Sequence, residues 1–374
     1  MKKLKIAMFG HKRIPSREGG VEIVVEQLST KMVKCGMQVT CFNRGGRFMY
    51  SGKKEQLKSY QGIIIKKVPT IDIRGVAAVS ASFFAALCSA VGPYDVIHIH
   101  AEGPAFFCWI PKLFHKKVVV TIHGLDWMRE KWQGGLGSKF IKKGEEHAVK
   151  YADDVIVLSK NMQQYFYDKY HRKTHFIPNG VERPEIKAAN QINKMYGLEK
   201  NQYILFLGRL VPEKGLMYLI NSFKNVNTKH KLVIAGGSSD TDEYTAEVKK
   251  AAMNDSRICF IGFVQGDILQ ELYSNAYVYV LPSDVEGMPL SLLEAMSYGN
   301  CCLVSDIKEI TEVVGNRAVI FQKGNVIMLT EKLQYLCDSE KEVNRYKLQA
   351  ADFICEKYNW DFVVNETLSV YLKG

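Results

Sequence analysis

Short apolar runs recur along the chain, and longer segments of mixed polarity separate them. Many of these runs are continuous rather than alternating, as expected of parallel strands that are covered on both faces. Strands that alternate with helical segments predict an α/β fold with two doubly wound domains. The strand candidates are KIAMFG, QVTCFN, GIIIKKV, DVIHIH, KVVVTIH, DVIVLS and THFIP in the first half, and YILFLG, KLVIAG, RICFIG, YVYVLP, CCLVSD and AVIFQ in the second.

The length of 374 residues, 47% of them hydrophobic, is enough for two separate cores. A polar segment between Asn179 and Gln202 joins a strand to a new series of strands and helices, and it contains Pro184. We therefore expect an N-terminal domain over residues 1–182 and a second domain over residues 183–357. Residues 358–374 include YNWDFVVNETLSVYL, which predicts a final amphipathic helix.

Glycine-rich or polar segments follow the runs that end in MFG, TIH, FLG, IAG, FIG and VLP. In doubly wound sheets, ligands bind beyond the carboxyl ends of the strands. All of these segments lie at such ends, so the sequence predicts one ligand-binding cleft between two facing domains.

The stretch EGMPLSLLEAM contains two carboxylates at a fixed spacing, Glu286 and Glu294. Glu286 precedes a predicted helix and Glu294 lies inside it, while Pro289 suits the first helical position. A helix start beside a glycine offers unpaired backbone N–H groups, which favour an anion. The alternative is an ordinary amphipathic helix with a solvated glutamate.

Two cations follow another predicted strand, in the segment FLGRLVPEKG. Arg209 offers a planar fork of donors and Lys214 a point charge, and both suit a phosphate. The alternative for these residues is a surface ion pair with Glu213.

Further segments in the chain, in order, are IPSREGGVE at 14–22, IHGLD at 122–126 and IPNGV at 177–181. Together with G-R-x4-K-G and E-x7-E, they resemble the retaining glycosyltransferases of family four, which have the GT-B fold and use nucleotide-sugar donors. The resemblance covers nearly the whole chain. The sequence of the first half, with GGVEIVVEQL, HAEGPAF and HGLDWMREKW, resembles those of bacterial enzymes that build capsular or other surface polysaccharides.

The resemblance implies a role for each of these segments, and the final helix would cross back onto the first domain. Arg209 and Lys214 would bind the donor diphosphate, Glu294 the ribose hydroxyls, and Glu286 a hydroxyl of the transferred sugar. His123 would lie over that sugar near the reacting carbon, with a structural histidine as the alternative. His98 and His100 alternate along a strand, and we expect only one of them to face the ligand. The remaining donor contacts would come from Gly19, Gly20, Gly236, Gly237, Gly262, Val264, Gly287, Met288, Pro289 and Leu290.

We expect neither a metal ion nor a cofactor. Asp240 and Asp242 form a D-x-D pair, but the pattern suits a loop and a helix N-cap. The charge of a departing nucleoside diphosphate would then be stabilised by side chains and by backbone N–H groups. The predicted reaction transfers a hexosyl or deoxyhexosyl group, with retention of anomeric configuration, to a glycan or polyprenyl-diphosphate-linked acceptor. The nucleotide is left open between UDP, GDP and dTDP.

Other functions remain open at this point. A nucleotide-sugar epimerase shares the two-domain fold, but it needs acids placed for elimination and proton return. A phosphorylase or glucan synthase is usually longer, and no lysine-anchored cofactor site is evident. A catalytically silent partner that binds a lipid-linked glycan is the alternative from another class, although the intact motifs favour an enzyme.

Charge is unevenly distributed along the chain. The net charge is +11, and residues 1–183 hold 30 Lys and Arg against 15 Asp and Glu, a net of +15. This asymmetry favours an anionic membrane surface over nucleic acid, for which no binding motif is evident; a basic face that only confers solubility is the alternative. The stretch VAAVSASFFAALCSAVG is too short to span a bilayer and predicts a buried helix, with an interfacial helix as the alternative. The nine scattered cysteines fit a reducing cytoplasm, so we expect a cytoplasmic protein, peripheral on the inner face of the plasma membrane.

Overall fold

The computed structural model describes residues 3–46, 57–73, 75–125, 127, 135–238 and 242–373. The chain forms two compact units, each of which has its own sheet. Unit 1 comprises Met1–Gly180 and Trp360–Gly374, and unit 2 comprises Val181–Asn359. The last segment of the chain thus belongs to the same unit as the first.

Unit 1 contains an eight-stranded sheet in the order β3-β4-β2-β1-β5-β6-β7-β8. Its strands pair in parallel except for β3, which is antiparallel to β4. The strand order reverses between β1 and β5, which places the ends of these two strands at a topological switch point. The strands are β1 (Lys5–Phe9), β2 (Gln38–Arg44), β3 (Ser59–Tyr60), β4 (Ile63–Val68), β5 (Val96–His100), β6 (Lys117–Ile122), β7 (Asp154–Val157) and β8 (His175–Phe176).

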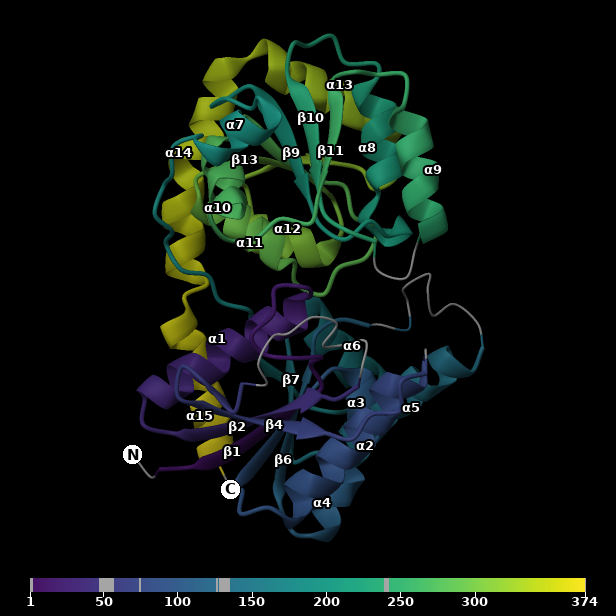
Figure 1. The fold of residues 1–374 in the computed structure, drawn as a ribbon, viewed down its shortest axis with the longest axis vertical. Coiled ribbons are helices and arrows are strands. Elements are labelled where there is room, and N and C mark those ends of the chain that lie inside the picture. Colours follow the sequence, from purple (N-terminus) through teal and green to yellow (C-terminus); the bar gives the residue numbers. More distant parts are fainter. Residues whose placement is uncertain are drawn as a thin grey trace. The chain divides into compact units, whose positions relative to one another are not determined.

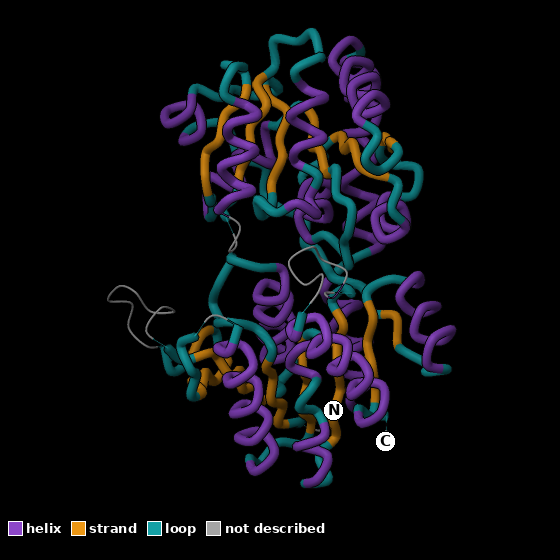
Figure 2. The backbone as a smooth tube through the Cα atoms, turned by 90° about the vertical axis from the view of Figure 1, so that its right-hand side faces the viewer, coloured by secondary structure: helices purple, strands orange, loops and turns teal. Residues whose placement is uncertain are grey.

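Helices cover both faces of this sheet (Figures 1 and 2). The central strands are therefore buried on both sides, and β5 is buried at every residue. Helix α15, at the chain end, packs against α1 of the same unit. The helices are α1 (Gly20–Lys34), α2 (Val76–Val91), α3 (Glu102–Ala105), α4 (Trp109–Leu113), α5 (Leu136–Tyr151), α6 (Lys160–Tyr170) and α15 (Trp360–Leu372).

Unit 2 contains a six-stranded sheet in the order β11-β10-β9-β12-β13-β14, and its strands pair in parallel throughout. Numbered from the first strand of the unit, this order is 3-2-1-4-5-6, the arrangement of dinucleotide-binding domains. The switch point lies between β9 and β12. The strands are β9 (Tyr203–Leu207), β10 (Lys231–Ala235), β11 (Ile258–Gly262), β12 (Val278–Leu281), β13 (Cys301–Ser305) and β14 (Val319–Phe321).

The helices of unit 2 lie on both sides of its sheet, as Figure 1 shows. Apolar side chains from the sheet and the flanking helices, among them Phe206, Leu219 and Leu333, form one core. The helices are α7 (Gln191–Tyr196), the 3₁₀ turn η4 (Pro212–Lys214), α8 (Leu216–Phe223), α9 (Asp242–Ala252), α10 (Gly266–Asn275), α11 (Leu290–Ser297), α12 (Lys308–Val314), α13 (Val326–Asp338) and α14 (Glu340–Lys357).

All of the apolar runs that predicted strands form strands, and the α/β class is confirmed. The two-residue strand β3 was not predicted, because so short an edge strand leaves no periodic pattern. The expectation of a buried helix at residues 76–92 is wrong in one respect. Helix α2 buries its small residues, such as Ala85 and Ala86, and exposes Phe83 and Leu87, each 39% accessible.

Within the described residues, no helix combines the length and the apolar character that a membrane span requires. All nine cysteines are free, and Cys35 and Cys88 are exposed rather than buried.

Candidate functional site

The loops after β9 and β12 flank the switch point of unit 2, and they meet through a buried ion pair. Lys214 follows β9, and its Nζ donates to Glu286 Oε1 over 2.5 Å. The side chains are 13% and 9% exposed, so the pair is largely shielded from water. Ser283 Oγ also donates to Glu286 Oε1, over 2.7 Å. Two residues to which the sequence gave separate roles thus share one contact.

Close backbone approach holds these two loops together. Gly215 has φ +65°, and a Cβ added there would lie 2.0 Å from the carbonyl oxygen of Pro282. Only glycine tolerates both conditions. The backbone N–H of Asp284 donates to the carbonyl of Glu213 over 2.8 Å. Glu213 therefore serves the loop through its backbone. Lys214, for which the sequence left open an ion pair with Glu213, pairs with Glu286 instead.

Glu294 lies on α11, within reach of a buried tyrosine. Tyr273 Oη donates to Glu294 Oε2 over 3.3 Å and to the carbonyl of Ser291 over 3.3 Å. Burial raises the pKa of Tyr273 well above its usual value, so the phenol remains a donor at neutral pH. The sequence placed Pro289 at the first helical position, but α11 begins at Leu290 and Pro289 is its N-cap, with φ −75° and ψ 109°. Glycine and methionine at 287 and 288 thus belong to the loop before the helix.

The glycines after β10 and β11 allow neighbouring loops to approach each other. Gly236 has φ +152°, and a Cβ there would lie 1.8 Å from the carbonyl oxygen of Gly208. Its N–H donates to the carbonyl of Gly262 over 2.8 Å, and Gly237 accepts from Leu210 N over 3.0 Å. Gly262 has φ +75° with open space at its Cβ position. Val264, which the sequence predicted as a donor contact, is 9% exposed.

Arg209 directly follows Gly208 at the end of β9, before the 3₁₀ turn that carries Lys214. The structure therefore gathers Arg209, Lys214, Glu286, Glu294 and the glycines along one edge of the unit 2 sheet. Asp284, which the sequence did not single out, also lies there. Burial raises the pKa of its carboxyl group, although Tyr218 donates to it over 3.1 Å and acts in the opposite direction.

In unit 1, Gly19 is the N-cap of α1 and Gly20 is its first residue. The side chain of Glu22 folds back over this helix start: a Cβ on Gly19 would lie 2.3 Å from Glu22 Oε2. Glu22 Oε1 accepts from the backbone N–H of Lys12 over 2.8 Å, and the residue is only 6% exposed. The sequence did not predict this buried carboxylate, although a glutamate three residues after an N-cap is a known capping signal.

Histidines from two neighbouring strands, β5 and β6, gather at the carboxyl edge of the unit 1 sheet. His123 follows β6, and its Nε2 lies 3.0 Å from His100 Nδ1 at the end of β5. The rings of His98 and His100 are 4.1 Å apart, so both face the same side. Residues two apart in a strand share a face, so alternation does not separate them, and which of the two faces the ligand stays a prediction. His98 also bonds Tyr371 Oη at 2.6 Å and Thr121 Oγ1 at 2.7 Å.

The chain turns sharply between His100 and α3. Ala101 has φ 78° and ψ 158°, a region that residues other than glycine occupy at a cost of about 1–3 kcal/mol. Glycines enclose this turn on two sides. A Cβ on Gly10 would lie 2.0 Å from the His100 carbonyl oxygen, and a Cβ on Gly144 would lie 1.9 Å from that of Glu102. Strain of this kind is concentrated at functional sites.

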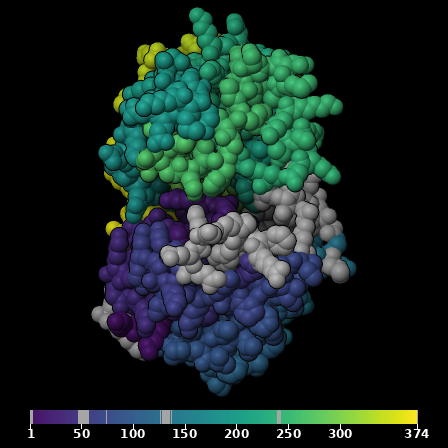
Figure 3. Space-filling model, viewed as in Figure 1, coloured from purple at the N-terminus to yellow at the C-terminus, as the bar shows by residue number. Residues whose placement is uncertain are grey.

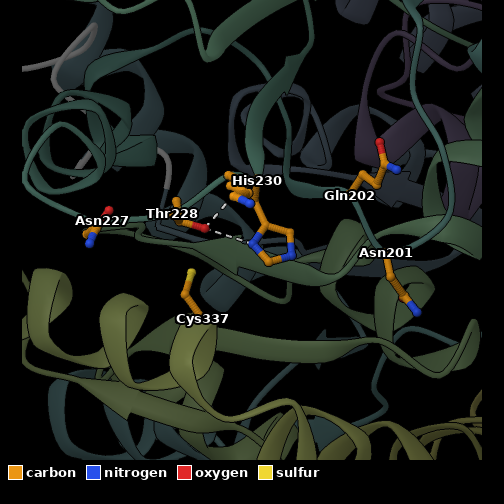
Figure 4. A pocket seen from close by; sticks show the side chains of 7 residues that line it. Asn201, Gln202, Asn227, Thr228, His230 and Cys337 are labelled. Atoms are coloured by element: carbon orange, nitrogen blue, oxygen red, sulfur yellow. Dashed lines mark hydrogen bonds between the residues drawn. The ribbon is translucent and has the colours of Figure 1, made fainter.

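A cavity of about 650 Å³ lies elsewhere, on unit 2 (Figure 4). Except for Cys337 on α13, its residues precede β9 or β10, so it is at the amino end of the strands, away from Lys214 and Glu286. Several of its polar groups already bond one another or a neighbour, such as Thr228 Oγ1 with His230 Nδ1 at 2.8 Å. It is therefore a poor candidate for the donor site. Its lining residues are Asn201, Gln202, Asn227, Thr228, Lys229, His230 and Cys337.

The part of the chain described by the structure holds no group of three or more His, Cys, Asp or Glu side chains suited to a metal ion. Asp242 begins α9, and its carboxylate accepts from Ser238 Oγ over 2.7 Å. Asp240 and Asp126, which belong to the D-x-D and IHGLD segments, lie outside the described residues.

Two known sequence families match the chain. Glycosyltransferase Family 4 matches residues 18–183, and Glycosyl transferases group 1 matches residues 188–353. An uncharacterized glycosyltransferase of Methanocaldococcus jannaschii is 30% identical over 305 residues, which are 75% of this chain and 76% of that protein. The N,N'-diacetylbacillosaminyl-diphospho-undecaprenol alpha-1,3-N-acetylgalactosaminyltransferase of Campylobacter jejuni is 28% identical over 181 residues, 48% of this chain and 46% of that protein.

A solved structure of similar fold is the crystal structure of Anabaena HepE in complex with UDP-glucose. Its TM-score is 0.80 at 15% identity, over 98% of this chain and 100% of that one. With a parallel α/β sheet in each unit, the chain has the GT-B fold that its sequence predicted.

The buried histidines of unit 1 predict a loss of stability in mild acid. Burial lowers the pKa of His98 to about 3 and that of His11 to about 4, and it lowers the pKa of His100 well below 6.5. Because unfolded histidines bind protons first as the pH falls below 6.5, the free energy of unfolding should decrease from pH 6.5 towards 5. The slope is at most about 1.4 kcal/mol per pH unit for each histidine.

Urea unfolding followed by tryptophan fluorescence measures this effect, since all four tryptophans of the sequence fall in unit 1. His98→Asn should reduce the slope by about one third, the share of one group among three. His171→Asn is the control, because His171 is exposed and asparagine suits its left-handed backbone. A free energy that stays level from pH 7.5 to 5.5 would contradict the prediction.

Proposed function

We propose that this chain, which belongs to glycosyltransferase family 4 and is a glycosyltransferase, transfers a hexosyl or deoxyhexosyl group from a nucleotide-sugar donor to a glycan or polyprenyl-diphosphate-linked acceptor. The transfer retains anomeric configuration, needs neither a metal ion nor a cofactor, and serves the synthesis of a surface polysaccharide. The sugar nucleotide is a uridine, guanosine or deoxythymidine diphosphate sugar.

The buried pair of Lys214 and Glu286 is the observation that carries this proposal. The two charges come from loops on either side of the switch point in unit 2, where ligands bind in sheets of this order. There Lys214 binds the donor diphosphate. Glu286, which is already paired with Lys214, accepts a hydrogen bond from a hydroxyl of the sugar. Arg209 adds a planar fork for a phosphate. A site that is largely shielded from water strengthens each of these interactions.

The remaining donor contacts follow from the same edge of the sheet. Glu294 accepts hydrogen bonds from both ribose hydroxyls. A carboxylate has enough lone pairs to accept these bonds and the bond from Tyr273 as well. The backbone at Gly262 and Val264 lies against the base, and Gly236 and Gly237 let the chain approach the nucleotide. Gly287 to Leu290 and, in unit 1, Gly19 and Gly20 add backbone groups. His123 lies over the transferred sugar.

Known proteins of related sequence and fold support the choice of substrates. The Campylobacter protein named above acts on a diphospho-undecaprenol compound, and Anabaena HepE has been solved with UDP-glucose. A polyprenyl-linked acceptor lies in a membrane, so the enzyme binds there as a peripheral protein on the cytoplasmic face, through unit 1.

The surface of unit 1 supports membrane binding. The exposed apolar residues of α2 are Val76, Phe83, Leu87 and Val91, and their spacing places them along one stripe of the helix. Leu113 and Phe114, at the end of α4, are also exposed, and α4 packs against α2. Exposed lysines such as Lys142 and Lys143 lie on α5, which contacts α4. The blue residues of α2 lie on the face drawn in Figure 3.

Substitution of the two cations tests the role in stabilising the leaving group. Arg209→Ala and Lys214→Ala should each reduce kcat by about 10²–10³-fold, the effect of losing one charge-stabilising donor. Turnover of a panel of UDP-, GDP- and dTDP-sugars by the full chain is the measurement. Lys249→Ala, an exposed lysine on α9, is the control. Full activity of both variants, or loss of wild-type activity with a chelator, would refute the metal-independent assignment.

The ion pair requires one further comparison, since Lys214→Ala also leaves Glu286 without its partner. The double variant Lys214→Ala/Glu286→Gln removes both charges. The single variant Glu286→Gln is the reference. If Lys214 acts on the diphosphate, the double variant is slower than Glu286→Gln alone; if Lys214 only balances Glu286, the two are equally active.

The two glutamates should have different effects on nucleotide affinity. Glu294→Ala should weaken binding of the free nucleoside diphosphate by about 10–100-fold, because hydrogen bonds to a charged group contribute about 1.5–3 kcal/mol. Glu286→Ala should reduce transfer and change that affinity little. Calorimetry with UDP, GDP and dTDP measures both, and Tyr273→Phe controls for altered packing around Glu294. Equal losses of affinity in the two glutamate variants would contradict the assignment.

Binding to vesicles tests the membrane surface. The protein should sediment with anionic vesicles at low salt and be released as salt rises, since the attraction is screened within about 8 Å at physiological ionic strength. Phe83→Ser/Leu87→Ser should weaken binding about 10-fold or more, by the loss of apolar contacts. Met253→Ser/Ile327→Ser, two exposed apolar residues of unit 2, is the matched control. A wild-type protein that ignores anionic vesicles at low salt would favour a soluble acceptor.

A further inference from the structure

His100 and His123 form a pair in which the position of each proton is constrained. Their ring nitrogens Nδ1 and Nε2 are 3.0 Å apart, so one of them donates. His100 is fully buried, and burial beside other histidines lowers its pKa well below 6.5. A neutral imidazole carries one N–H donor and one acceptor nitrogen. The pair therefore has two possible arrangements.

The second nitrogen of His100 decides between these arrangements. His100 Nε2 is buried, and within the described part of the chain it meets no hydrogen-bond partner. A buried N–H without a partner is rarer, and less tolerable, than an acceptor without one. The proton of His100 thus belongs on Nδ1, where it is donated to His123 Nε2. It follows that His123 accepts at Nε2 and carries its own proton on Nδ1.

The same geometry keeps His123 neutral. A protonated His123 would donate from Nε2, and His100 would then have to accept at Nδ1. This would place the proton of His100 on its unpartnered Nε2. Both nitrogens of His98 are bonded, to Tyr371 and Thr121, and its ring lies 4.1 Å from that of His100. The His100 ring is therefore packed in place.

The turn at Ala101 fixes His100 and a second anchor together. On the other side of Ala101, Glu102 is fully buried and hydrogen-bonds Glu145. Glu145 Oε2 accepts from Trp127 Nε1 over 3.0 Å, while Tyr165, Tyr170 and Lys169 donate to Oε1. The residues on either side of Ala101 are therefore linked to both ends of the segment from His123 to Trp127. His100 bonds His123. Glu102 bonds Glu145, which in turn accepts from Trp127.

We propose that His100 is a positioning residue, which holds His123 as the neutral tautomer protonated at Nδ1. The functional consequence rests on the proposed location of His123 beside the transferred sugar. In that location His123 acts as a neutral imidazole, and it does not take up a proton during the reaction. The fold holds the turn at Ala101 against its local cost, and His100 directly precedes that turn.

Nuclear magnetic resonance tests the tautomer without any turnover. In the full chain labelled with ¹⁵N-histidine, long-range ¹H–¹⁵N correlations distinguish a protonated Nδ1 from a protonated Nε2. The His123 signal is identified by its absence in His123→Asn. At pH 7.5 we expect His123 to carry a proton on Nδ1 alone. A proton on Nε2, or on both nitrogens, would overturn the proposal even if the enzyme proves to be a glycosyltransferase of the expected kind.

Two substitutions of His100 separate positioning from packing. The side-chain amide nitrogen of asparagine can occupy the place of Nδ1, whereas that of glutamine lies one bond further out, near the place of Nε2. His100→Gln should lower kcat about 10–100-fold, the effect of losing a partner that orients a functional histidine, with the KM for the donor nearly unchanged. His100→Asn should retain most of the activity and the Nδ1–H tautomer of His123.

The comparison remains informative if folding is affected, because both variants lose the buried ring. Equal losses of kcat in the two variants, with the His123 tautomer unchanged in both, would show that His100 only fills space. Failure of the wild-type protein to use any nucleotide sugar would instead refute the proposed function, and the tautomer measurement would still stand.

Discussion

Parallel strands that are buried on both faces restrict where polar chemistry can occur in this protein. A charged or hydroxylated side chain within such a strand loses water on both sides, so it is placed at the strand ends. In unit 2, Lys214 and Glu286 follow β9 and β12 on either side of the point at which the strand order reverses. In unit 1, His100 ends β5 and His123 follows β6. The topology of each sheet thus gathers residues that are far apart in the sequence.

The pair of Lys214 and Glu286 illustrates how such a site differs from a stabilising feature. A largely buried ion pair contributes little net stability, because desolvation offsets the attraction, but removal of one partner costs about 3–5 kcal/mol. The two charges therefore contribute little to folding alone. They lie next to Gly215, which allows the two loops to approach closely. An anionic ligand that meets Lys214 would use a charge that is already held in place, with little reorganisation.

The histidine cluster in unit 1 differs from the ion pair in unit 2, because its side chains are neutral. His11, His98 and His100 are each at most 1% exposed, and burial keeps them neutral at physiological pH. Neutral imidazoles can orient one another through single hydrogen bonds without the mutual repulsion of charged rings. The strained backbone at Ala101 and the flanking glycines show that this arrangement is held by the fold against a local cost.

The sequence by itself determined the α/β class, the positions of the strands and the family, because continuous apolar runs and the glycine and charge motifs are local properties. It also indicated Lys214, Glu286, Glu294 and His123 as individual residues. Only the tertiary structure decided which of them meet: the contact of Lys214 with Glu286 spans 72 positions, and that of His98 with Tyr371 spans 273. The backbone conformation of Ala101 was likewise hidden, since a single residue's φ angle depends on packing that no local pattern encodes.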